Sequence, residues 1–159
     1  MVKIVDLTGE WAAAIGKAFI AFGSMEWMTV ICLRDIPVDR IQRSTKSFSL
    51  SQRIDLIQEL LEIHEGEVIK LLSEKLSAVK KLAERRNFIA HNPLVLEFYE
   101  SLDGDISHKQ VIMSMHKGRR MTLPELQAFA DEAEKLASDL TGAGLEAVRT
   151  LHSQRNSAH

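Results

Sequence analysis

The chain has 159 residues, of which 45% are apolar and 26% are charged, and its formal net charge is -2. This length fits one domain with a single core, and the composition is that of a globular rather than a disordered protein. The charge excludes a protein that is basic throughout, so a nucleic-acid site has to be a local basic patch. The single cysteine, Cys32, excludes an internal disulfide and favours a reducing cytoplasm.

The N-terminal part of the chain holds its most apolar stretch. Residues 1–10 carry three charged side chains and no long apolar run, which argues against a signal peptide. Residues 11–33 are mostly apolar but include Lys17 and Glu26. A charge at the centre of a membrane span costs roughly 2.5–3.5 kcal/mol. We therefore expect a helix buried on most of its surface, and no membrane span.

Apolar side chains recur every three or four residues in this stretch, which predicts a helix that ends before Pro37. Ile20 and Trp27 lie off the main stripe, so a second face is also apolar. Such a helix needs neighbours on both sides, in a bundle or a dimer interface. Gly16 and Gly23 would let another helix approach closely. Residues 35–49, with Arg40 and Arg43, then form an exposed connection, either a solvated loop or a rim that contacts phosphate.

Two further helices are predicted before the middle of the chain. Ser49 or Ser51 begins the first of them, and Gly66 breaks its pattern. The next runs over residues 67–91, because Pro93 disfavours a helical conformation in the residue before it. At ~100° per residue, Arg86 falls on the buried side of this helix and Arg85 on the solvent side.

Residues 94–122 do not follow a helical period. The runs 94–99 and 111–115 are typical of β-strands, and Asp103-Gly104-Asp105 lies between them, which predicts a small hairpin or irregular excursion. The far end of this segment is basic, and it is either an RNA contact or a solvated tip. Its candidate RNA-contacting residues, with those of the earlier connection, are Arg40, Arg43, Lys117, Arg119 and Arg120.

The last long helix begins at the capping box Thr122-Leu123-Pro124-Glu125. Gly142 and Gly144 are the points at which it could be interrupted, and residues 153–159 read as a frayed tail. The sequence thus predicts a single all-α domain over residues 1–159, with four or five helices in a bundle and a small hairpin before the last helix.

One short segment, Arg86-Asn87-Phe88-Ile89-Ala90-His91, combines an arginine, an asparagine and a histidine at the end of a helix. Arginine is always charged and binds phosphate well, and histidine side chains titrate near neutral pH. Asn87 and His91 share a helix face. Arg86 and His91 lie ~140° apart on an ideal helix, so they converge on one ligand only if the helix unwinds at His91.

Arg86-Asn87-x-x-x-His91 resembles the Arg-x4–6-His motif of the HEPN superfamily (higher eukaryotes and prokaryotes nucleotide-binding), in which an asparagine often follows the arginine. The resemblance implies a helical bundle that forms a homodimer, with the motif residues of both subunits lining a cleft at the dimer axis. Many members are metal-independent endoribonucleases, often toxins or host-defence effectors. Others have lost catalysis and bind a nucleotide or a protein.

By this resemblance Arg86 and His91 are catalytic, Asn87 is a supporting polar group, and Glu26 is a further polar partner in the cleft. The implied partners are RNA, a second copy of the chain and an antitoxin protein, with no cofactor or metal. Some of these toxins carry a modifiable tyrosine two residues after the histidine, where this chain has Pro93. The alternatives are a non-catalytic dimeric binding module, and a structural role in which Arg86 pairs with Glu26 and His91 caps its helix.

Overall fold

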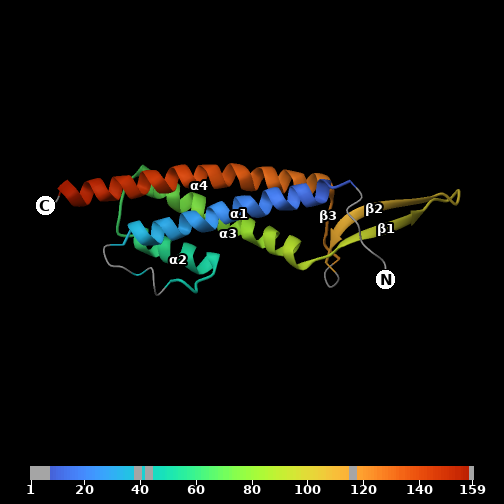
Figure 1. Ribbon diagram of the computed structural model, residues 1–159, viewed down its shortest axis with the longest axis horizontal. Coiled ribbons are helices and arrows are strands. Elements are labelled where there is room, and N and C mark those ends of the chain that lie inside the picture. Colours follow the sequence, from blue (N-terminus) through green and yellow to red (C-terminus); the bar gives the residue numbers. More distant parts are fainter. Residues whose placement is uncertain (1–7, 38–40, 42–44, 115–117, 158–159) are drawn as a thin grey trace.

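The computed structural model describes residues 8–37, 41, 45–114 and 118–157. These residues form four helices and a small antiparallel sheet, and the helices lie alongside one another in one elongated body (Figure 1). The protein is therefore mainly helical, but it is not all-α. Its elements are α1 (Glu10–Asp35), α2 (Leu50–Leu61), α3 (Glu67–His91), β1 (Leu94–Glu100), β2 (Ile106–Met113), β3 (Arg120–Met121) and α4 (Leu123–Ser157).

The two longest helices, α1 and α4, run side by side in the same direction. Lys17 near the start of α1 pairs with Asp131 of α4 at 2.8 Å. Near the other end, the Asp35 carbonyl lies 3.1 Å from the His152 ring nitrogen. The helices approach closely at Gly144, where a Cβ atom would lie 2.6 Å from the Met28 methyl group. This pair of helices forms the main wall of the core.

The structure departs from the expectation that α1 is buried on most of its surface. By length and composition α1 could cross a membrane, yet only 39% of its most apolar window is buried in the fold. One side packs against α4, α2 and α3. On the other side Ile20 is 74% exposed and Trp27 is 63% exposed. The second neighbour that the apolar pattern requires is therefore not supplied by the described part of this chain.

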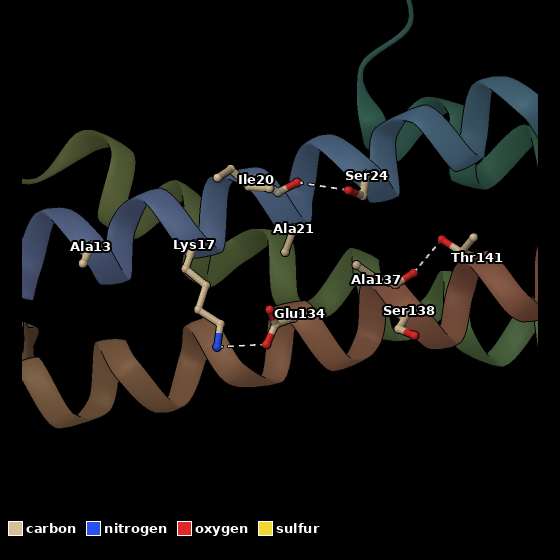
Figure 2. Close-up of a pocket in the computed structure, with 9 residues that line it drawn as sticks. All are labelled: Ala13, Lys17, Ile20, Ala21, Ser24, Glu134, Ala137, Ser138 and Thr141. Carbon is tan, nitrogen blue, oxygen red and sulfur yellow. Dashed lines mark hydrogen bonds and ion pairs between the residues drawn. The ribbon is translucent and has the colours of Figure 1, made fainter.

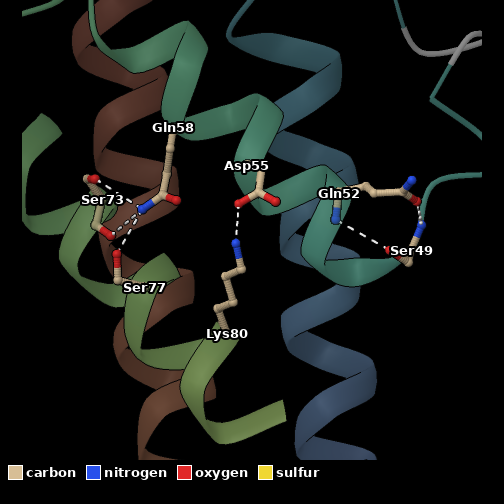
Figure 3. A network of polar contacts seen from close by, with 7 residues as sticks. All are labelled: Ser49, Gln52, Asp55, Gln58, Ser73, Ser77 and Lys80. Carbon is tan, nitrogen blue, oxygen red and sulfur yellow. Dashed lines mark hydrogen bonds and ion pairs between the residues drawn. The ribbon is translucent and has the colours of Figure 1, made fainter. Parts of the chain in front are cut away.

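Helix α2 begins where the sequence predicted and packs across α3 (Figure 3). The Ser49 backbone N–H donates to the Gln52 side chain at 2.9 Å, and the Gln52 backbone N–H donates to the Ser49 hydroxyl at 3.4 Å. Gln58, further along the same helix, reaches α3. Its amide donates to the Ser73 carbonyl at 3.2 Å and to the Ser77 hydroxyl at 2.8 Å.

Replacing Gln58 with alanine is expected to lower the free energy of unfolding by about 1–2 kcal/mol, because two part-buried acceptors on α3 lose their donor. Urea unfolding followed by circular dichroism measures this. Glu59→Ala, a neighbouring exposed position on α2, is the matched control and should change stability by less than about 0.5 kcal/mol. Equal effects of the two substitutions would contradict this role of Gln58.

The segment between α3 and α4 is the predicted hairpin, extended by a short third strand. β1 pairs antiparallel with β2, from Leu94 opposite Ile112 to Glu100 opposite Ile106, and β2 pairs with β3. In Figure 1 the hairpin extends from the end of the helical body. The segment that follows β2 thereby lies close to the end of α3, where Arg119 contacts Phe88.

Helix α4 is longer than the sequence suggested. It runs without interruption through Gly142 and Gly144 to Ser157, so residues 153–157 are helical and not a frayed tail. The Arg155 guanidinium donates to the Ile36 carbonyl, which ties the end of α4 to the end of α1. This tertiary contact is invisible in the polar local sequence, which is why the tail prediction was wrong.

Candidate functional site

The candidate site lies on the last two turns of α3. Pro93 forces Asn92 out of the helix, and Asn92 has the extended values φ -125 and ψ 141. Its side-chain amide donates to the Phe88 carbonyl at 2.7 Å, which caps the helix. The helix therefore continues through His91 and does not unwind there. Arg86 and His91 remain ~140° apart in helical phase, and one chain alone does not converge them.

Arg86 points from α3 toward α1. Its Nη2 donates to the Glu26 carboxylate at 3.3 Å, and its guanidinium carbon lies 5.4 Å from the centre of the Phe22 ring. The side chain is 25% exposed, and its Nε is buried without a partner among the described residues. A guanidinium has five N–H donors, so one long ion pair leaves most of its capacity for a ligand.

Arg85 is 35% exposed, in line with helical phase, but it also contacts α4, which helical phase did not predict. Its Nη1 pairs with Glu132 of α4, and its guanidinium carbon lies 4.8 Å from the centre of the Phe129 ring. The flank of α3 that carries Arg85 is covered by α4, which periodicity in α3 alone cannot reveal. Phe22 and Phe129 are themselves stacked at 6.1 Å, so the two arginines lie on the two rings of one aromatic pair.

Asn87 and His91 lie one turn apart on the outer face of α3. Both residues are exposed, and neither side chain hydrogen-bonds to another residue in the described part of the chain. His91 is therefore not held by a structural contact there, and its ring nitrogens are open to a solute. The site consists of an inward arginine and an outward asparagine–histidine face on the same helix end.

The hairpin adds one further cation to this helix end. Arg119 lies over the Phe88 ring, with its guanidinium carbon 4.8 Å from the ring centre. Arg120 instead pairs with Glu97 of β1 at 2.8 Å, which neutralises its charge. The other three predicted RNA contacts, Arg40, Arg43 and Lys117, lie outside the described residues. Sequence reasoning missed Phe88, whose only signal was an aromatic residue inside the motif.

The contact between Arg86 and Glu26 is expected to contribute little to stability. Both side chains are partly exposed, and the measured worth of such pairs is about 0–1 kcal/mol. Glu26→Gln should therefore lower the free energy of unfolding by at most about 1 kcal/mol. Thermal unfolding measures this, with Glu10→Gln at the exposed start of α1 as control. A loss of several kcal/mol would instead make the pair a structural tie between α1 and α3.

Among the described residues, no group of three or more His, Cys, Asp or Glu side chains is placed to hold a metal ion. The only cysteine, Cys32, is fully buried, and burial raises the pKa of its thiol to about 12. The chemistry available at the end of α3 is thus that of a guanidinium, an amide and an imidazole. Comparisons with protein-family models, curated protein sequences and solved structures return no match to this chain.

Proposed function

We propose that the protein is a dimeric, metal-independent endoribonuclease of the HEPN type, in which Arg86 and His91 are catalytic and Asn87 supports them. The observation that carries this proposal is the state of Arg86. It is held in place by Glu26 and Phe22, but its Nε is buried without a partner among the described residues. Buried donors are almost always paired, and exceptions occur at functional sites.

The chemistry requires only groups that the chain supplies. RNA carries its own nucleophile, the 2′-hydroxyl. Neutral His91 would take its proton, and a protonated histidine would give one to the leaving 5′-oxygen. Arg86 would hold the phosphoryl oxygens and stabilise the charge that develops on them. The products are a 2′,3′-cyclic phosphate and a 5′-hydroxyl end.

A second copy of the chain completes this arrangement. Within one subunit His91 and Arg86 lie on different sides of α3, so His91 of one copy acts together with Arg86 of the other. A two-fold axis creates two such sites, and in each of them one His91 takes the 2′-hydroxyl proton and then, in its protonated form, gives a proton to the leaving 5′-oxygen. Arg119, on Phe88, provides a nearby cation for the RNA backbone.

The test is cleavage of end-labelled RNA by the purified protein in excess EDTA. Cleavage with 2′,3′-cyclic phosphate ends is the expected result, detected as 3′ ends that resist alkaline phosphatase until mild acid has opened the cyclic phosphate. Absence of cleavage for structured and single-stranded RNAs alike would reject the enzyme.

One observation favours a second candidate, a non-catalytic module that binds a nucleotide or a protein. Part of the Arg86 charge is already offset by Glu26. Such a module binds RNA or nucleotides without cleaving them, and titration calorimetry with mononucleotides and a short RNA distinguishes the two. An antitoxin partner belongs to the first candidate and would be found by copurification. The cytoplasm is the compartment we infer, from a lone buried thiol.

A further inference from the structure

One face of α1 has the spacing of a helix–helix interface but no partner among the described residues. Ala13, Gly16, Ile20, Gly23, Trp27 and Val30 follow one another at steps of three and four, the seven-residue repeat of a coiled coil. We name these six residues the α1 seam. Ile20 and Trp27 are 74% and 63% exposed, and a Cβ added at Gly16 or Gly23 would meet nothing within 4 Å. Large side chains therefore alternate with open glycine positions.

A groove of about 670 Å³ opens beside the seam, between α1 and α4 (Figure 2). Its walls are mostly small side chains, with Ile20 on one side and Lys17 bridging to Glu134 on the other. The remaining lining residues are Ala13, Ala21, Ser24, Ala137, Ser138 and Thr141. The groove shares Ala13 and Ile20 with the seam, so it extends the open surface of the seam toward α4.

We propose that the α1 seam binds the α1 seam of a second copy, with the two helices antiparallel. Symmetry about the midpoint between residues 21 and 22 places Ile20 against the partner subunit's Gly23. The same symmetry places Trp27 against the partner subunit's Gly16. Both of the largest side chains then meet a glycine. A parallel pair would instead set Trp27 against its own copy and leave holes between glycines, which close packing does not tolerate.

The charge and the apolar area of the α1 seam both favour a second copy of the chain as its partner. The seam itself carries no charged side chain, and the flanking Lys17 and Glu26 are already paired with α4 and α3. Association therefore buries no unpaired charge, the costliest defect of an interface. Ile20 and Trp27 together expose on the order of 300 Å² of apolar surface. The groove walls add to this area, toward the roughly 800 Å² per partner of a standard interface.

The antiparallel seam also bears on the candidate site. Its two-fold axis is perpendicular to both helices, so the flank that carries Glu26 and Arg86 lies on the same side in both copies. Glu26 is about four and a half residues from the midpoint, so the two carboxylates are ~13 Å apart along the helix direction. This consequence rests on the proposed function, which requires a second copy, whereas association itself is measurable without RNA.

The glycines give a test in which folding and association respond in opposite directions. Leucine at Gly16 or Gly23 fits the free chain and is the better helix former, so both variants should keep or raise the melting temperature of the subunit. Analytical ultracentrifugation should find a dimer for the unaltered chain and association weakened by roughly a hundredfold in each variant, the order expected for overpacking a close contact. Gly142→Leu, at an equally open glycine of α4, is the matched control and should remain dimeric.

Register is tested by cross-linking. A mixture of Ile20→Cys and Gly23→Cys chains should form a disulfide-linked heterodimer. Neither variant alone should cross-link as fast, because the symmetry sets position 20 opposite position 23 of the partner and not opposite its own copy. The native Cys32 is buried and does not interfere. A monomeric unaltered chain, dimers that survive both glycine substitutions, or a chain that partitions into phosphatidylcholine vesicles through this face would overturn the proposal. If the protein forms the seam dimer but cleaves no RNA, the seam proposal remains valid and only the proposed ribonuclease activity is rejected.

Discussion

Replacing His91 with alanine is expected to reduce the rate of RNA cleavage by about two to four orders of magnitude, the usual contribution of a general acid or base. Its side chain is exposed and makes no hydrogen bond to another described residue, so the fold loses nothing. The free energy of unfolding should therefore change by less than about 0.5 kcal/mol. His152→Ala, at an exposed histidine that contacts the Asp35 carbonyl far from the site, is the control and should cleave normally.

Arg86→Lys sharpens the same experiment. Lysine keeps the positive charge beside Glu26, but it loses the planar fork that grips two phosphoryl oxygens. Cleavage should fall by about 10²–10³, the loss seen when one donor to a developing oxyanion is removed. Lys81→Ala, on the exposed side of the same helix, should have no effect. Cleavage that survives both His91→Ala and Arg86→Lys would reject these residues as the catalytic pair.

Mixing the two variants adds a test of shared sites. If His91 of one copy works with Arg86 of the other, chains carrying His91→Ala mixed with chains carrying Arg86→Lys form heterodimers with one intact site. Such a mixture should recover up to about a quarter of the unaltered activity, since half of the dimers are mixed and each has one of two sites. No recovery in mixtures shown to exchange subunits would place both residues in the same subunit's site.

The sequence predicted the helices well where their signals are local. The apolar period of α3, the serine that begins α2 and the proline after His91 each act within a few residues. Whether another element covers an apolar helix face could not be predicted in the same way. The pattern in α1 shows that Ile20 and Trp27 lie off the main stripe, but not whether another element of the chain covers them.

In the candidate site, too, the features that depend on local sequence were predicted and those that depend on distant segments were not. Helical phase correctly placed Arg86 toward the interior, where it meets Glu26. It could not predict that the partly exposed Arg85 contacts Glu132, because this residue lies on α4, more than forty residues later in the sequence. The contact between Arg119 and Phe88 likewise depends on how the hairpin folds back on α3. Contacts between distant segments carry no periodic signal, so the full site emerged only with the fold.

The largest effect on stability is expected at Phe129, which lies under the site. Its side chain is fully buried, it stacks on Phe22, and Arg85 covers its ring. Phe129→Ala should lower the free energy of unfolding by about 3–5 kcal/mol, through lost burial and the cavity left behind. At roughly 2–4 °C per kcal/mol for a chain of this size, the melting temperature should fall by about 10 °C.

Phe98→Ala is the control for this substitution, because Phe98 is 68% exposed on the hairpin and should cost little. A second measurement separates stability from support of the site. Since Phe129 holds Phe22 and Arg85, the folded fraction of the Phe129→Ala protein should also place Arg86 less well. Cleavage per folded molecule, measured well below the melting temperature, should then fall by about tenfold or more. Unchanged cleavage per folded molecule would show that the aromatic pair stabilises the core without positioning Arg86.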